Sequence, residues 1–142
     1  MKTKLFTLTA LLLTVVFISS CKKEDPDSLR SKIAGRWQIE KIETRTYAAN
    51  GTTVTSTNTV GYTNADYMDF KNNENDELEI NLGSGNRVMG NYVVLFGQSF
   101  NISLSNKLLY CDTDNITDNS FQFTGTVDQS NPKVTETYYL KR

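Results

Sequence analysis

Few residues in this chain can do acid–base or nucleophilic chemistry. It contains no histidine, so the commonest general base and metal ligand is missing, together with every Ser-His and Cys-His pair. Cys111 ends an apolar run without a neighbouring base, which favours a buried, unreactive thiol. Glu77 and Glu79 share the expected solvent face of a strand, whereas a glycosidase pair must converge across a cleft. The sequence therefore predicts a protein that is not an enzyme.

An acidic stretch at residues 112–115 begins like a calcium-binding loop. Asp112 and Asp114 have the required spacing, but Ile116 occupies the next ligand position. No glycine provides the sharp turn, and no glutamate closes the loop. The alternative is an Asx-rich hairpin turn, which explains the same residues. We expect no bound metal.

Cys21 ends an N-terminal segment of a different kind. Lys2 and Lys4 precede a 14-residue apolar run at residues 5–18, shorter than the ~20 residues that span a bilayer. The run ends in Ile18-Ser19-Ser20-Cys21, which resembles the end of bacterial lipoprotein signal peptides. The resemblance implies cleavage of residues 1–20, a diacylglycerol on the Cys21 thiol and an acyl chain such as palmitate on its amine. The alternative is an ordinary secretory signal.

Two or three acyl chains anchor a protein stably, at ~0.8 kcal/mol per buried CH₂ group. Residues 21–28, which include Pro26, are expected to form a flexible lipidated tether. Residues 22–25, Lys-Lys-Glu-Asp, are similar to the basic-then-acidic export signals of some surface lipoproteins; a solvated spacer is the alternative. We therefore expect a cell-envelope protein, lipid-anchored at the outer membrane on its periplasmic or its surface-exposed side.

The composition limits the remaining function classes. Removing residues 1–20 takes away two lysines and no acid, which leaves 13 basic and 16 acidic residues and a net charge of −3. The chain has no basic stripe, so we expect no nucleic-acid partner. The remaining 122 residues suit one domain, and Cys111 is then the only unmodified thiol, so no intrachain disulfide is expected.

The hydrophobic pattern changes from helical to strand-like near residue 36. Asp27 or Ser28 can cap a short helix that carries Leu29 and Ile33 on one face. From Trp37 onward the apolar period is two, with a phase slip that predicts a β-bulge near residues 40–41. The later strands predict these inward side chains: Met68, Phe70, Leu78, Ile80, Leu82, Val88, Tyr92, Val94, Phe100, Ile102, Leu104, Phe121, Phe123, Val127, Val134, Tyr138 and Leu140.

Several details of the pairing can also be predicted. Asn50-Gly51 indicates a two-residue hairpin turn, followed by a polar strand at residues 52–59 that should lie at an edge or over the mouth of the fold. Asn81 is expected to face water, and residues 108–111, apolar on both faces, are expected to be covered on both sides. About nine short strands linked by hairpins predict an antiparallel sandwich or an up-and-down barrel, and the connections favour an eight- to nine-stranded barrel.

Gly35-Arg36-Trp37, after a short helix and before consecutive hairpins, is similar to the Gly-x-Trp motif of lipocalins. The resemblance covers residues 29–142 and implies a lipocalin-like barrel. In that family the tryptophan packs under the barrel floor with a basic side chain stacked on it. This implies a floor anchor formed by Gly35, Trp37 and either Lys141 or Arg142, of which we expect Arg142.

A binding function remains after these exclusions. An eight-stranded barrel is just wide enough to be filled by side chains or to hold one small ligand. The bulky inward residues indicate a mostly packed interior with a shallow apolar cup, for which Tyr92, Phe100, Phe123 and Tyr138 are the candidate ligand-binding residues. The lipocalin resemblance implies capture of a small hydrophobic ligand without a cofactor. The alternative is an interaction or structural module of an envelope-protein complex, with a filled barrel.

Overall fold

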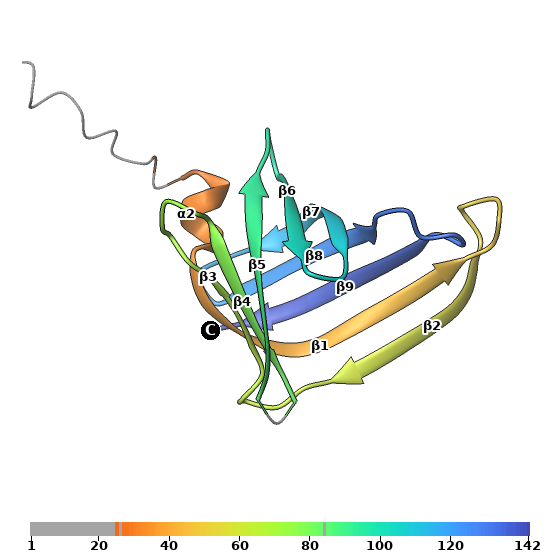
Figure 1. Ribbon diagram of the computed structural model, residues 1–142, viewed down its shortest axis with the longest axis horizontal. Helices are drawn as coiled ribbons and strands as arrows, with labels where there is room; N and C mark the ends of the chain where they lie inside the picture. Colours follow the sequence, from red (N-terminus) through yellow and green to blue (C-terminus); the bar gives the residue numbers. More distant parts are fainter. Residues whose placement is uncertain (1–24, 26, 84) are drawn as a thin grey trace, which may run out of the picture.

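The protein is a closed antiparallel β-barrel, seen in a computed structural model that describes residues 25, 27–83 and 85–142. Strands β3 to β9 pair in sequence order, and β9 pairs back onto β1 (Figure 1). Eight strands therefore close the ring, and β2 is an extra strand outside it, which confirms the predicted barrel with its short helix. In the described residues the elements are α2 (Leu29–Ile33), β1 (Gly35–Tyr47), β2 (Val54–Gly61), β3 (Tyr67–Phe70), β4 (Glu77–Leu82), β5 (Asn86–Val94), β6 (Ser99–Leu104), β7 (Leu108–Ile116), β8 (Ser120–Val127) and β9 (Val134–Lys141).

Helix α2 is short and depends on the barrel for its stability. The Ser28 hydroxyl caps it by accepting a hydrogen bond from the Ser31 backbone N–H at 3.2 Å. Leu29 and Ile33, one helical turn apart, are both buried against the core. Five helical residues are too few to be stable alone, so the burial of these two side chains holds the helix at its end of the barrel.

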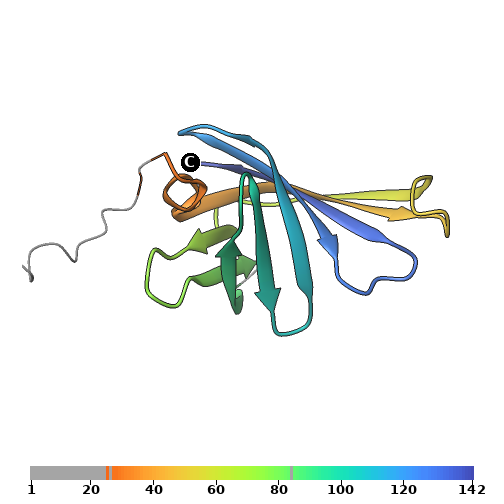
Figure 2. The ribbon, with the colours of Figure 1, turned by 90° about the horizontal axis from the view of Figure 1, so that it is seen from above.

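Strand β1 belongs to both the barrel and a projecting hairpin. One of its edges pairs with β3 over Gly35–Gln38 and then with β2 over Lys41–Tyr47. The other edge pairs with β9, and its register shifts between Ile39 and Lys41, as the predicted bulge requires. The β1–β2 hairpin consequently extends beyond strands β3 to β7 (Figures 1 and 2).

Aromatic side chains fill the barrel interior. Each inward strand position alternates with an outward one, so the rings of neighbouring strands meet inside. Phe70, Phe100 and Phe121 are fully buried, with ring centroids 6.0–6.2 Å apart. Phe70 also meets the ring of Tyr92 edge-on at 5.3 Å, a favoured aromatic geometry.

Three sequence-based expectations about local structure are wrong. Asn81 is buried, because its amide donates to the Ala65 carbonyl at 2.8 Å and the β2–β3 loop covers it. Tyr110 is 46% exposed, so β7 is covered on its inner face only. The hairpin loop spans residues 48–53, with the Ala48 N–H bonded to the Thr53 carbonyl, instead of a two-residue turn.

The predictions for the N-terminal segment fall outside the described residues. They are the signal peptide at residues 1–20, lipidation of Cys21 and most of the tether at residues 21–28. Within the described part, no helix combines the length and apolar character needed to cross a membrane.

Candidate functional site

The two ends of the barrel differ, and the end next to α2 is closed by a stacked aromatic–cation pair. Trp37 is fully buried and donates from its indole N–H to the Ile33 carbonyl at 2.8 Å. The Arg142 guanidinium lies 3.8 Å from the centre of the Trp37 ring and donates to the Ala34 carbonyl. Gly35 has a φ of +101°, and a Cβ there would lie 3.3 Å from the Arg142 guanidinium.

The structure thus brings Gly35, Trp37 and Arg142 together at the barrel floor. Lys141, the other basic residue considered for this position, faces outward and pairs with Glu40 at 2.9 Å. The alternation of side chains along β9 explains why Lys141 does not stack on Trp37. Leu140 points into the core, and Lys141 therefore points away from it. This end is a packed structural plug.

The four candidate ligand-binding residues are all buried inside the barrel. They are Tyr92, Phe100, Phe123 and Tyr138. Phe123 contacts Phe100 at 5.1 Å and stacks on Tyr138 with centroids 4.7 Å apart and planes at 9°. Among these four residues, Tyr138 lines a cavity, at the end of the barrel opposite α2. A ligand at this end would therefore contact Tyr138, with Phe123 beneath it.

The open end of the barrel holds a small, mostly apolar cavity, which we call the mouth cup. Its volume is about 150 Å³. Side chains from β4, β5 and β6 form its apolar wall, and the β6–β7 turn and β9 contribute polar groups. The lining residues are Ile80, Leu82, Val88, Leu104, Asn106, Lys107 and Tyr138.

A charged pair and a phenol form the polar side of the mouth cup. The Lys107 ammonium donates to the two carboxylate oxygens of Glu136 at 2.8 and 2.6 Å. The Tyr138 hydroxyl donates to the same carboxylate, and Lys107 lies 3.4 Å from the Tyr138 oxygen. The Lys107 and Glu136 side chains are only 25% and 15% exposed. The desolvation of such a pair offsets much of its attraction, so stability alone gives little reason for its presence here.

Burial raises the pKa of Tyr138 well above its usual value, and the negative charge of Glu136 raises that pKa further. Tyr138 is therefore a protonated hydrogen-bond donor at neutral pH. Lys107 and Glu136 cancel each other's charge. The mouth cup is consequently a neutral site with oriented polar groups on one side, which suits an apolar ligand with at most one polar atom.

Asp66 joins two loops beside the mouth. Its carboxylate accepts hydrogen bonds from the Thr63 N–H at 2.7 Å, the Thr63 hydroxyl at 2.8 Å and the Gly83 N–H at 2.5 Å. The backbone N–H groups of Thr63 and Gly83, and then the Thr63 hydroxyl, lower the pKa of Asp66. The ionised carboxylate thus fixes the β2–β3 loop against the β4–β5 turn, which frames this end of the barrel.

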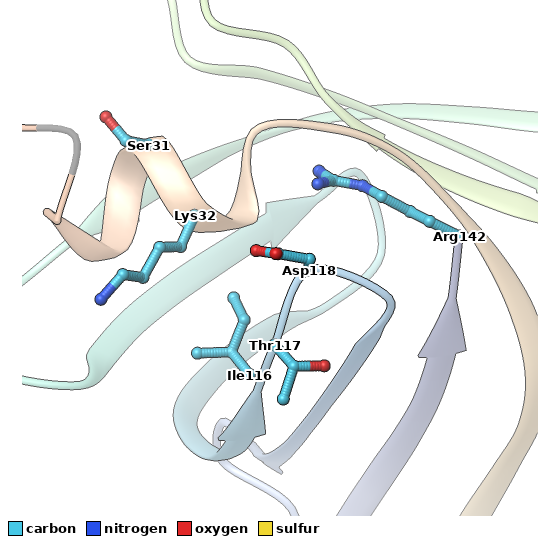
Figure 3. Close-up of a pocket in the computed structure, with 6 residues that line it drawn as sticks. All are labelled: Ser31, Lys32, Ile116, Thr117, Asp118 and Arg142. Carbon is cyan, nitrogen blue, oxygen red and sulfur yellow. The ribbon is translucent and has the colours of Figure 1, made fainter.

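A second hollow lies at the closed end, between α2 and the β7–β8 turn. Its volume is about 250 Å³, and Ser31, Lys32, Thr117, Asp118 and Arg142 supply its polar lining together with the apolar Ile116. Figure 3 shows Asp118 pointing from the turn toward α2, whereas the Lys32 side chain points away from Arg142. This hollow has no convergent set of groups and less apolar character than the mouth cup, so the mouth cup is the better candidate site.

The remaining chemically interesting residues do not form a site in the described part. Cys111 is buried, and burial raises the pKa of its thiol, which keeps it protonated. Asp112 accepts from the Ser99 hydroxyl, and Asp114 accepts from Gln122 and Thr124, as strand residues of β7. No group of three or more acidic, cysteine or histidine residues suited to a metal ion occurs among the described residues.

The polar strand expected at residues 52–59 is β2, at Val54–Gly61. All eight of its residues are exposed, and among the described strands it pairs with β1 alone. It therefore lies at a sheet edge, on the hairpin that extends beyond the barrel, and does not line the mouth cup.

Sequence reasoning missed Lys107, Glu136 and Asp66. Lys107 and Glu136 are 29 residues apart in the chain, so no local spacing connects them. The only signal for Asp66 was the Thr63-Asn64-Ala65-Asp66 stretch, whose Thr and Asp are common turn-forming residues.

Comparison with known proteins adds no relative. No protein-family model, no curated protein and no solved structure matches this chain.

Proposed function

We propose that this protein is a lipid-anchored, non-catalytic binding protein of the bacterial cell envelope, and that its mouth cup takes a small apolar ligand. The mouth cup carries the proposal, because it is concave, mostly apolar and provided with a few oriented polar groups. The anchor is supported by the lipoprotein-like stretch that ends at Cys21. The neutral Tyr138 and the protonated Cys111 thiol favour binding over nucleophilic chemistry.

The cavity volume limits the ligand. About 150 Å³ matches the engineered apolar cavity that binds benzene, and it is smaller than the ~300–1,000 Å³ of most drug-sized sites. The ligand, or the part of it that enters, is therefore about the size of one aromatic ring or a short branched chain. Tyr138 and Lys107 lie where they can orient one polar atom of that ligand.

Two substitutions on β5 test this function. Val88 lines the mouth cup, whereas Val93 is 54% exposed on the outer face of the same strand. We expect benzene to bind saturably to the parent protein, measured by chemical-shift titration of the methyl groups. Val88→Trp should fill the cup and abolish the binding, and the matched Val93→Trp should leave it unchanged. Circular dichroism checks that both variants are folded. If Val88→Trp misfolds, Leu104→Phe fills the same cup with a smaller change in volume.

A second function, the docking of an envelope protein, is favoured by β2. One edge of this strand has no partner strand in the part of the chain that the structure describes, and residues 46–65 carry no charge. Natural edge strands usually carry charges, proline or bulges that prevent pairing with other chains. No saturable benzene binding, together with loss of a larger envelope complex in Thr57→Lys, would favour this function over ligand binding.

A further inference from the structure

Most of the exposed large apolar side chains lie on three neighbouring elements. Of seven such side chains in the described residues, five lie on β5, the β5–β6 turn and β7, and the other two on β2. Phe96, in the turn, is 99% exposed, and the adjacent Leu95 is 47% exposed. The five are Met89, Val93, Leu95, Phe96 and Tyr110.

The tip of this surface also lacks charge. Residues 88–106 contain no acidic or basic residue, so Arg87, near the start of β5, is the one charged residue of the β5–β6 hairpin. Val93 of β5 lies opposite Asn101 of β6, which lies opposite Tyr110 of β7, so the exposed row continues across three strands. Moving a charge out of water has a large desolvation free energy. An uncharged turn with an apolar tip avoids this cost when it leaves water.

The β5–β6 turn lies at the same end of the barrel as α2. Asp76 connects them, because it forms an ion pair with Arg30 of α2 and accepts the Tyr92 N–H of β5 through its carbonyl. From Tyr92 the strand continues toward Leu95 and Phe96, and the turn projects from that end in Figure 1. The mouth cup is at the opposite end.

The chain length between the anchor and the helix keeps this end near the membrane. Cys21 precedes Leu29 by eight residues, which span at most ~29 Å when fully extended. The closeness of this end to the membrane rests on the lipid anchor of the proposed function. With Cys21 in a bilayer, the tether holds the Leu95–Phe96 tip at a high local concentration next to that bilayer.

We propose that Leu95 and Phe96 insert into the interface of the same bilayer and form a second, non-covalent contact beside the lipid anchor. Phe and Leu are among the side chains that membrane-surface segments bury at the boundary of headgroups and acyl chains, and fluid lipid needs no complementary pocket for a convex two-residue tip. A protein partner would have to bury ~800 Å² on each side with matched shape, which such a projecting turn does not provide. The contact orients the barrel so that the mouth cup faces away from the membrane.

The lipidated full-length protein, purified and reconstituted in phosphatidylcholine vesicles, tests this contact. Phe96→Trp places a second tryptophan at the tip, and Val54→Trp places one at another exposed apolar position, on β2. Brominated lipids quench tryptophans that enter the bilayer, whereas Trp37 is buried in the barrel and supplies a constant background. We expect most of the emission added by Phe96→Trp to be lost and that added by Val54→Trp to be retained.

Separate readouts distinguish the contact from the anchor. Mass spectrometry of the purified protein and flotation with the vesicles report the acyl chains and membrane binding. A protein without acyl chains would overturn the anchor and this proposal together. A protein that floats, with Phe96→Trp quenched no more than Val54→Trp, would overturn the membrane contact alone and leave the tip available to a protein partner.

Discussion

Tyr138 belongs both to the core and to the candidate site. Its ring stacks on Phe123, and its hydroxyl bonds to Glu136 at the wall of the mouth cup. Burial and the Glu136 charge raise its pKa above the value of about 10 that an unfolded tyrosine has. Between these two pKa values the unfolded chain releases a proton that the folded protein keeps. The stability that Tyr138 contributes is therefore fully present below about pH 10 and lost as the pH rises through its folded pKa.

The first prediction concerns this loss of stability at alkaline pH. In the parent protein, the free energy of unfolding should fall as the pH rises above about 10. In Tyr138→Phe that fall should be shallower, because one of the groups responsible is gone. It should not vanish, because burial also raises the pKa of Cys111. Urea unfolding at a series of alkaline pH values measures the slope, and equal slopes in parent and variant would contradict the assignment.

Single-residue roles could be predicted from the sequence where one strong local signal exists. Trp37 begins an amphipathic strand, and Arg142 follows the last strand, so their stacking could be inferred from a family resemblance. Lys107 lies in a polar turn and Glu136 at an ordinary strand position, and neither has a local signal. Their contact depends on how the barrel closes, since β9 must lie across from the β6–β7 turn. The polar half of the candidate site is consequently a product of tertiary structure.

Strands β5 and β6 approach each other unusually closely at Gly90. A Cβ at this position would overlap the Ser103 carbonyl oxygen and lie 2.7 Å from Cδ2 of Leu104. Gly90 pairs with Leu104 in the barrel wall, so a side chain would push β5 away from β6. The missing side chain thus permits the curvature that shapes the hairpin below the apolar tip.

The second prediction concerns this approach. Gly90→Ala should lower the free energy of unfolding by about 1–3 kcal/mol, as overpacking does, because the atom nearest to the new Cβ is a backbone carbonyl oxygen, which cannot turn aside as a flexible side chain can. Gly61→Ala on β2 is the matched control, since among the described residues no atom beyond its chain neighbours lies within 4 Å of its Cβ position. We expect that control to stay within about 0.5 kcal/mol of the parent protein in urea unfolding. A neutral Gly90→Ala would show that the two strands separate easily.

Most elements could be predicted because every barrel strand has one apolar face, in contrast to the polar β2. The pattern Leu78, Ile80, Leu82 predicts β4 directly, and the phase slip after Ile39 predicts the bulge in β1. The pattern fails where a loop covers an outer face, as it does at Asn81, or where an outer face is apolar, as it is at Tyr110. Period-two alternation distinguishes the two faces of a strand but does not show what covers each one.

At the scale of the whole molecule, one series of rings joins the closed floor to the open mouth. Trp37 contacts Phe121 at 5.5 Å, Phe121 contacts Phe123 at 5.1 Å, and Phe123 stacks on Tyr138. The hydrophobic core is therefore continuous along the barrel, and the mouth cup is the place where this filling ends. Tyr138 lines the cup, and the ring of Phe123 stacks directly behind it.

The last prediction tests whether Phe123 limits the size of the ligand. Phe123→Ala and Phe121→Ala should each cost about 3–5 kcal/mol of stability, because both remove a fully buried ring. Only Phe123→Ala should extend the mouth cup inward, since Phe121 lies deeper, toward the Trp37 floor. We expect indole to bind Phe123→Ala more tightly than the parent protein and Phe121→Ala no more tightly, as measured by calorimetry below the unfolding transition. Equal indole binding by both variants would contradict this arrangement, and Phe123→Leu would repeat the test with a smaller loss of stability.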